Sequence, residues 1–258
     1  MIPDVRKSYR GFILLVFVLI FFSSFQQKKI FNKSIASSVK LIFINNVRGT
    51  KIFLNDSTYT NSFGEKYTIS KLRYYVTNVS LRNGHNNIKE KNSYHLIDES
   101  KTESQVVNLS LPEGDYNSLQ FLLGVDSLHN VSGAQTDDLD PAKDMFWTWN
   151  TGYVMAKMEG NSPDSKLVNN KFEFHIGGFS GPYNVLKQVQ LNFPGKIFHF
   201  VAGGAYQIII QADINAWWQN PNDIKISDHA IITSPGKFAK EISDNYVNMF
   251  HIEKIISE

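Results

Sequence analysis

Hydrophobic and polar residues alternate along most of this chain in short runs that are separated by turn-forming residues. Alternation with a period of two is the pattern of a β-strand with one buried face. It predicts strands close to residues 39–44, 67–81, 94–97, 106–111, 116–123, 153–158, 171–176, 185–193, 198–201 and 206–214. The segment Asn83-Gly84-His85-Asn86-Asn87 has the composition of a hairpin loop. The pattern therefore predicts an all-β chain.

A different period appears only near the C-terminus. Apolar side chains recur there at helical spacing, at Phe238, Ile242, Tyr246, Met249 and Phe250. Ser234 and Pro235 suit the start of such a helix. Many short strands joined by long loops favour a β-sandwich or jelly-roll-like fold. We therefore expect residues 38–258 to form one all-β domain with a short C-terminal helix.

The first residues have the pattern of an export signal. Arg6, Lys7 and Arg10 precede an unbroken apolar run from residue 12 to residue 22. As a helix this run is about 16 Å long, whereas a membrane-spanning helix needs roughly 20 residues. We interpret residues 1–27 as a secretory signal peptide, either cleaved or kept as an anchor, and residues 28–37 as a polar tether. The domain is then periplasmic or extracellular, and it meets the membrane only through an uncleaved signal.

Composition excludes several kinds of chemistry. The chain has no cysteine, which excludes disulfides, thiolate metal sites and a lipidated N-terminal cysteine. Its 26 basic and 24 acidic residues are well mixed and leave a net charge of +2, so no nucleic-acid footprint is indicated. No nucleophile–base pattern is present, and we do not expect an enzyme. Four carboxylates crowd one segment without the spacing of a calcium loop, at Asp126, Asp137, Asp138 and Asp140.

Candidate chemistry gathers around the aromatic stretch that runs from Asp144 to Tyr153. It contains Met145, Trp147 and Trp149, and it follows a polar, turn-rich segment of about eighteen residues. Loops of that length inside a compact domain are often functional. The two indoles share one face of an extended chain. They either fill the core or line a site.

Two histidines stand close to this stretch in a suggestive context. His175 alternates with Phe172 and Phe174 and therefore faces away from those rings on a regular strand. Gly177 and Gly178 follow it and let another backbone or a ligand approach closely. His129 lies in the polar segment beside Asp126 and Asn130. Taken alone, each histidine is as readily explained by a structural hydrogen bond. In a chain without thiols, imidazole, aromatic and thioether groups together suit copper better than structural zinc.

Four segments, in this order, resemble the MbnP-like family of exported copper-binding proteins, which is named for a methanobactin-associated member. They are Tyr74-Tyr75-Val76-Thr77-Asn78-Val79, Gly124-Val125-Asp126-Ser127, Met145-Phe146-Trp147-Thr148-Trp149-Asn150-Thr151-Gly152-Tyr153 and Phe174-His175-Ile176-Gly177-Gly178. The resemblance covers about residues 38–252. It implies an exported β-rich domain that binds one copper ion. It also implies that histidine nitrogens and a tryptophan oxidised to kynurenine help to hold the metal, and that a di-haem peroxidase-like partner makes this modification.

The resemblance assigns roles to particular residues. His175 matches the histidine before the glycine pair, and Trp147 or Trp149 matches the tryptophan of the aromatic motif. His129 stands where relatives often carry histidine next to asparagine, but the order here is His-Asn rather than Asn-His. The expected metal ligands are therefore His175, His129, Trp147 and Trp149. The expected wall of the site is Asp126, Met145, Tyr153, Gly177 and Gly178.

Three hypotheses follow for the function. The first is copper binding in trafficking or storage. The second is an exported binding module whose aromatic loop docks a ligand or a protein without metal. The third, an enzyme, lacks a supporting motif. The first two differ in geometry, because copper binding requires His175, His129 and one of the two indoles to converge.

Overall fold

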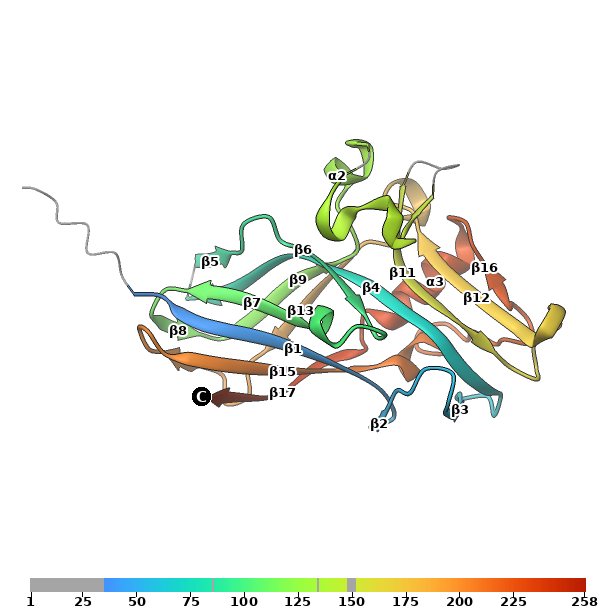
Figure 1. Ribbon diagram of the computed structural model, residues 1–258, viewed down its shortest axis with the longest axis horizontal. Helices are drawn as coiled ribbons and strands as arrows, with labels where there is room; N and C mark the ends of the chain where they lie inside the picture. Colours follow the sequence, from blue (N-terminus) through green and yellow to red (C-terminus); the bar gives the residue numbers. More distant parts are fainter. Residues whose placement is uncertain (1–34, 85, 134, 148–151) are drawn as a thin grey trace, which may run out of the picture. The chain divides into compact units, whose positions relative to one another are not determined.

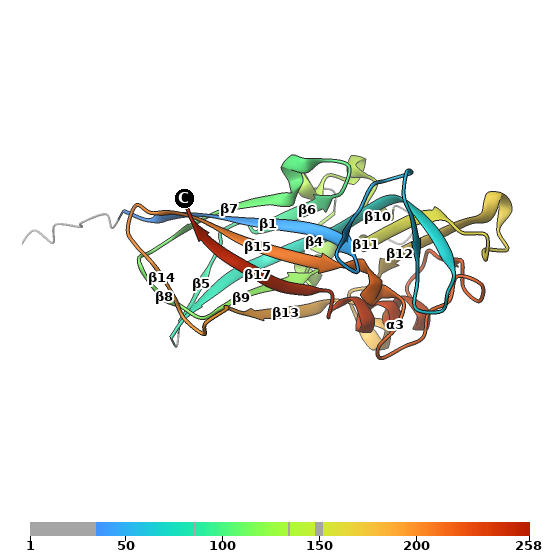
Figure 2. The same cartoon turned by 90° about the horizontal axis from the view of Figure 1, so that it is seen from below.

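Two facing β-sheets make up most of the computed structural model, which describes residues 35–258 apart from 85, 134 and 148–151. The predicted signal peptide and most of the predicted tether lie outside the described residues. Within the described part of the chain, one sheet has five strands, the other has ten, and a separate pair joins β8 (Gly114–Tyr116) to β14 (Phe198–Phe200). Figures 1 and 2 show the two main sheets from directions at right angles.

The smaller sheet joins the beginning of the described chain to its end. Its strands are β1 (Ser37–Val47), β2 (Thr50–Lys51), β7 (Val106–Leu111), β15 (Ala205–Asp213) and β17 (Phe250–Ser257). β1 runs parallel to β15 and antiparallel to β7, and β17 lies on the far side of β15 (Figures 1 and 2). The first strand is therefore buried between strands that the chain adds much later.

The larger sheet is organised around β4, an unusually long strand of 18 residues. β4 pairs in turn with β3, β5, β6, β9 and β11. The strands of this sheet are β3 (Thr58–Thr60), β4 (Lys66–Asn83), β5 (Asn86–Lys89), β6 (Tyr94–Asp98), β9 (Ser118–Leu123), β10 (Phe146–Trp147), β11 (Gly152–Asn161), β12 (Lys171–Gly177), β13 (Lys187–Asn192) and β16 (Ile231–Ile232).

Aromatic side chains hold the two sheets together. Phe43 of β1 makes edge-on ring contacts with Tyr74 of β4 and Phe121 of β9, at centroid distances of 6.5 and 6.0 Å. Phe250 of β17 contacts the same three rings. Such pairs add roughly 0.5–1.5 kcal/mol each beyond the area they bury. The inner faces of both sheets are thus apolar, as the period-two pattern predicted.

A second apolar layer lies under β11 and β12. The indole of Trp218 contacts Tyr67, Phe172 and Phe174 at centroid distances of 4.8 to 6.0 Å. Trp218 follows the helical turn η7 (Ile214–Trp217), and α3 (Lys237–Tyr246) packs beside it. Inward-facing residues of β12 are consequently buried, and its alternate residues face the opposite side of the sheet.

The polar segment before the aromatic stretch folds into short helical turns, which are α2 (Ser127–Val131), η3 (Asp137–Leu139) and η4 (Pro141–Lys143). Further turns are η2 (Thr102–Gln105), η5 (Val168–Asn170) and η6 (Gly181–Tyr183). Asp126 begins α2, because its carboxylate accepts a hydrogen bond from the backbone N–H of His129 at 3.0 Å. Among the described residues, no helix has the length and apolar character needed to cross a membrane.

The predicted fold class is confirmed, but the predicted C-terminal end of the helix was wrong. The all-β sandwich and the short helix near the C-terminus are both present. The apolar stripe at helical spacing, however, continues past the end of the helix: α3 ends at Tyr246, and Phe250 opens β17 instead. Phe250 belongs to the core between the sheets, so its spacing from Tyr246 coincides with a helical period without reflecting one. Most of β17 is exposed, and it lacked a clear strand pattern.

A buried carboxylate fastens the loop after Trp218 to the β3–β4 hairpin. Glu65 is only 6% exposed and accepts hydrogen bonds from the backbone N–H groups of Ile226 and Ser227, at 2.8 and 2.9 Å. Asn61 donates a third at 2.6 Å. Burial alone would raise the pKa of this carboxyl, but these hydrogen bonds outweigh it and lower the pKa below its ordinary value of 4.5.

Replacing Glu65 with glutamine should destabilise the fold by roughly 1–3 kcal/mol at neutral pH. The amide group has one oxygen and one NH₂ group in place of two acceptor oxygens, so one of the two backbone N–H groups loses its acceptor. A lowered pKa in the folded state means that the carboxylate stabilises the protein above pH 4.5 and loses that contribution as the pH falls through the folded pKa. Urea unfolding of wild type and Glu65→Gln at neutral and at acidic pH measures this. The same difference in unfolding free energy between the two proteins at both pH values would contradict the prediction.

Candidate functional site

The indole of Trp147 lies directly on the backbone of Gly177. Trp147 pairs with Gly152 in the short β10–β11 hairpin and is 7% exposed. A Cβ added at Gly177 would lie 2.4 Å from the indole Cζ3 and 2.6 Å from Cη2. No side chain fits there without displacing the ring. The glycine that the sequence placed after His175 is therefore required by the close approach of this tryptophan.

His175 stands two residues before Gly177 on the same strand. Residues two apart in a strand project to the same face, so the imidazole and the indole share the outer face of β12. Phe172 and Phe174 are fully buried on the other face, as the alternation predicted. The structure thus brings His175 and Trp147 to one side of one strand.

Glu159 of β11 orients the His175 ring. Its Oε1 lies 2.8 Å from the imidazole Nε2, which leaves Nδ1 as the other ring nitrogen. The hydrogen bond from His175, aided by Lys71 and opposed by burial, lowers the pKa of Glu159 to about 2. Asp126 belongs to another network, and the strand register places Glu159 beside the histidine.

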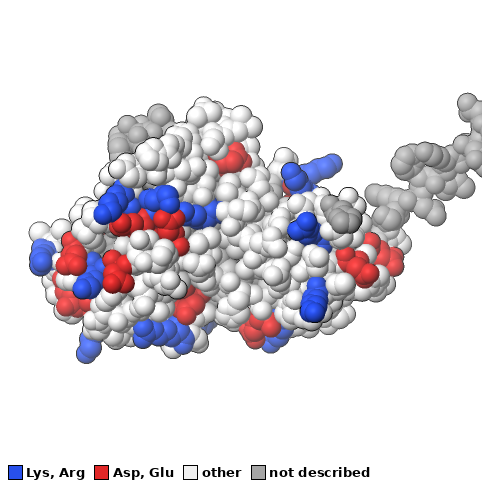
Figure 3. Space-filling model, turned by 180° about the vertical axis from the view of Figure 1, so that it is seen from behind, with Lys and Arg blue, Asp and Glu red and all other residues white. Residues whose placement is uncertain are grey.

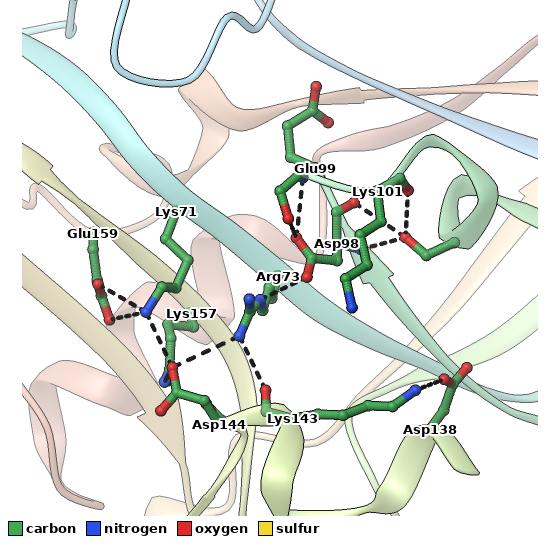
Figure 4. A network of polar contacts seen from close by, with 12 residues as sticks. Lys71, Arg73, Asp98, Glu99, Lys101, Asp138, Lys143, Asp144, Lys157 and Glu159 are labelled. Atoms are coloured by element: carbon green, nitrogen blue, oxygen red, sulfur yellow. Dashed lines mark hydrogen bonds and ion pairs between the residues drawn. The ribbon is translucent and has the colours of Figure 1, made fainter.

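A network of charged groups surrounds Glu159 on this outer face (Figure 4). Lys71 lies 3.2 Å from Glu159 and 3.0 Å from Asp144. The Lys157 side chain is only 3% exposed, and its ammonium lies 3.0 Å from the Asp144 carboxylate and donates to the Asp144 carbonyl oxygen. Burial lowers the pKa of Lys157. Since Asp144 directly precedes Met145, this network fixes the start of the aromatic stretch on the sheet.

Arg73 extends the network along β4. Its Nη1 donates to the carbonyl oxygen of Lys143 at 3.0 Å, and its Nε lies 2.9 Å from the Asp98 carboxylate without hydrogen-bond alignment. Arg73, Lys157 and His175 occupy one row across β4, β11 and β12. Elsewhere the charges are interspersed: Figure 3 shows basic and acidic groups side by side on the opposite view of the molecule.

A cleft of about 730 Å³ opens beside the indole. Aromatic rings form much of its wall, at Phe146, Trp147, Tyr153 and Phe179, and Gly178 and Pro235 complete one side. Tyr153 contacts Phe146 at a centroid distance of 5.0 Å, and its hydroxyl donates to the carbonyl oxygen of Leu139 at 2.6 Å. Gly178 lets the chain pack closely in this wall, because a Cβ at this position would lie 2.9 Å from the carbonyl oxygen of Tyr183.

His129 does not face this cleft. Its neighbours Asn130 and Val131 line the cleft, and Asn130 accepts a hydrogen bond from the backbone N–H of Tyr153 at 2.9 Å. Successive residues of a helix point in directions about 100° apart. The His-Asn order therefore turns the imidazole of His129 toward a different cleft, where its Nδ1 lies 2.9 Å from Asp126 and 2.7 Å from Tyr94.

The remaining residues of the expected site are placed as follows. Met145 is fully buried, and its carbonyl oxygen accepts from the N–H of Val154. Trp149 lies outside the described residues. Within the described ranges, no three side chains of His, Cys, Asp or Glu are grouped as metal ligands would be.

Two groups of residues that contact the expected site residues could not be identified from the sequence. Glu159 and Lys157 alternate on β11 opposite His175, and the pairing of two polar strand positions became visible only with the register. Tyr94 looked like an ordinary strand residue, because nothing in the sequence connects it to a helix more than thirty positions later. Both depend on contacts between distant segments.

The fold and the site together define an all-β sandwich protein with an aromatic cleft at the end of a hairpin. A model of the MbnP family matches residues 36–235, which is most of the chain, so the chain belongs to this family. The resemblance inferred from the motifs is thereby confirmed.

One solved structure supports the same fold. MbnP from Methylosinus trichosporium matches with a TM-score of 0.53 and 12% sequence identity, over 86% of this chain and 99% of that chain. At this identity the match establishes the fold alone. The comparison with curated proteins gave no significant match.

Gly177→Ala should destabilise the protein by roughly 1–3 kcal/mol, because the added methyl group overlaps the indole of Trp147. Replacing Trp147 with phenylalanine in the same chain should relieve part of that cost. A double-mutant cycle measured by chemical unfolding, with tryptophan fluorescence as the probe, gives the coupling between the two positions. Strictly additive effects would show that the ring does not limit the size of residue 177.

Proposed function

We propose that this protein binds one copper ion on the outer face of β12, with an imidazole nitrogen of His175 as a ligand and the indole of Trp147 beside it. The observation that carries the proposal is the contact of Trp147 with Gly177, two residues from His175 on the same face. Membership of the MbnP family supports the same chemistry, because copper binding is what the resemblance implied.

The surroundings of His175 fit a metal ligand. A ligating histidine usually has its second nitrogen bound to a carboxylate or a carbonyl, which fixes the ring and its tautomer. The bond from Nε2 to Glu159 supplies that partner and leaves Nδ1 for the metal. Lys71 offsets part of the charge on Glu159, so this carboxylate acts as an orienting group. Imidazole is a good ligand for copper, and the chain has no thiol to compete.

His129 is not part of this proposal, because it takes part in a separate network with Tyr94 and Asp126. A further ligand beside His175 would instead come from oxidation of Trp147 or Trp149. Indole offers only an N–H donor, whereas kynurenine has an aryl amine and a carbonyl oxygen. The aromatic cleft gives an oxidising partner access to one side of Trp147. We infer a di-haem peroxidase-like protein as that partner.

The proposal places the protein outside the cytoplasm. The basic residues followed by a short apolar run at the N-terminus are the support for export to the periplasm or beyond. The absence of cysteine fits a domain that is stabilised by its core rather than by disulfides. Copper trafficking or storage is the corresponding role.

His175→Ala, expressed in the native host, should contain much less copper than wild type, because one nitrogen ligand is lost. His199→Ala is the matched control, since His199 is an exposed histidine on β14 that bonds to Asp115 and is distant from β12 in the sheet pairing. Metal analysis of the purified proteins measures the difference. Equal copper in wild type and His175→Ala would contradict the proposed site.

A peptide that contains Trp147 or Trp149 should carry the mass increase of kynurenine when the protein is purified from its native host. Trp217 and Trp218 are fully buried and serve as internal controls that should remain unmodified. Tryptic mapping by mass spectrometry tests this. Unmodified indole at both positions 147 and 149 in native material would refute the oxidation step and leave the His175 ligand as a separate question.

A metal-free binding module is the second candidate. It is favoured by the wall of the cleft, where the described lining residues include four aromatic side chains and no histidine. Apolar pockets of roughly 300–1,000 Å³ with a few polar groups are typical of small-molecule sites. Copper-free native protein in the experiment on His175 would make this the better explanation of the cleft.

A further inference from the structure

A groove of about 440 Å³, separate from the aromatic cleft, lies between the two sheets. One side is formed by β5 and the two residues after it, and the other side by β7 (Figure 1). Among the described strands, β5 pairs with β4 alone and β7 pairs with β1 alone. The groove therefore lies where each sheet ends in an edge strand.

The floor of this groove is apolar, and its mouth is polar. Side chains alternate along β7, where Leu109 and Leu111 are buried and Asn108 and Ser110 are exposed. Such alternation places neighbouring side chains on opposite sides of a strand. Apolar residues of β4 and β5 complete the floor, at Val79, Leu81 and Ile88. An occupant consequently meets hydrocarbon inside the groove and polar groups at its opening.

Two lysines give the mouth a positive charge. Lys89 and Lys91 line it, and both are exposed. Within the described residues, neither ammonium has an ion-pair or hydrogen-bond partner. The acidic residue between them, Glu90, is engaged by His95, whose Nε2 lies 2.8 Å from the Glu90 carboxylate. Lys89 and Glu90 also border the cleft at Tyr94, whereas Lys91 borders the groove and not that cleft.

We propose that this groove binds the single acyl chain of a fatty acid, with the carboxylate at Lys89 and Lys91 and the hydrocarbon between the sheets. Its volume falls within the roughly 300–1,000 Å³ of small-molecule sites, which are typically apolar with a few polar groups that fix the orientation. Removal of methylene groups from water supplies the affinity, and the two cations determine which end of the ligand faces solvent. The groove is independent of the copper site proposed at His175.

Other occupants complement the groove less well. The chain's own tether contains Lys28, Lys29 and Lys33, so the two lysines at the mouth would repel it. A cationic amphiphile meets the same repulsion. A neutral peptide strand would pair with the free edge of β7 and leave both lysines without a partner. The charges therefore favour an anionic chain.

Isothermal titration calorimetry of the purified protein with decanoate, kept below its critical micelle concentration, tests the proposal. We expect one site per chain. Octanoate, which is two methylene groups shorter, should bind roughly tenfold more weakly, because less apolar surface is buried. Decyltrimethylammonium has the same chain length and the opposite charge, and it should bind at least about tenfold more weakly than decanoate.

One pair of variants tests the charged mouth. The double variant Lys89→Gln/Lys91→Gln should bind decanoate about tenfold more weakly and should lose most of the preference for decanoate over decyltrimethylammonium. The control is Lys166→Gln/Lys171→Gln, which removes two exposed lysines from the connection between β11 and β12. This control should bind both ligands as wild type does.

A second pair of variants tests the apolar floor. Ile88→Trp fills the groove with an indole and should abolish decanoate binding. Ile231→Trp changes an exposed isoleucine of β16 and should leave binding unchanged. Thermal unfolding by circular dichroism shows whether Ile88→Trp is folded. Should it not fold, the variant at the exposed residues Lys89 and Lys91 decides the question.

Decanoate binding that is weakened in the Lys89 and Lys91 variant and kept in both controls supports the proposal. The absence of binding to wild type overturns it. Binding that neither the lysine variant nor folded Ile88→Trp changes also overturns it, because the ligand would then occupy another site such as the aromatic cleft. None of these results depends on the copper content of the protein, so the proposal at His175 is tested separately.

Discussion

The buried ammonium of Lys157 is the contact on which the site depends most. It binds both the carboxylate and the backbone carbonyl oxygen of Asp144, at the end of a helical turn where Asp144 adopts a left-handed conformation. A lysine that is only 3% exposed requires such partners, because an unpaired buried charge is very costly. The pair therefore holds the polar segment against the outer face of the sheet and determines where Met145 and the residues after it begin.

Covering this face produces two clefts with different chemistry. One is built from aromatic rings and the backbone of two glycines, and Trp147 forms its inner wall against Gly177. The other is built from a phenol, a carboxylate and an imidazole around Tyr94. The helix α2 separates them, with Asn130 and Val131 on one side and His129 on the other. A change of one position in the order of two residues thus decides which cleft receives the imidazole.

The two clefts depend on different parts of the chain. The contact between Trp147 and Gly177 depends on β12 and on the hairpin that carries Trp147. The side chains that α2 presents depend on helical phase, because successive residues of a helix point in directions about 100° apart. His129 therefore faces one cleft and Asn130 lines the other.

The sequence by itself determined the fold class, most of the strands and the outward direction of His175, because the period-two pattern of a half-buried strand is local. It also identified the aromatic stretch and the glycines after His175 as special, since each breaks an otherwise regular pattern. Only the tertiary structure decided the partner of His175, the separation of His129 from Trp147 and the contact of Tyr94 with His129. Glu159 contacts His175 because of the register between β11 and β12. Tyr94 contacts His129 because β6 and α2, which are distant in the sequence, lie side by side. Such contacts depend on how distant segments are aligned, and local periodicity carries no information about that alignment.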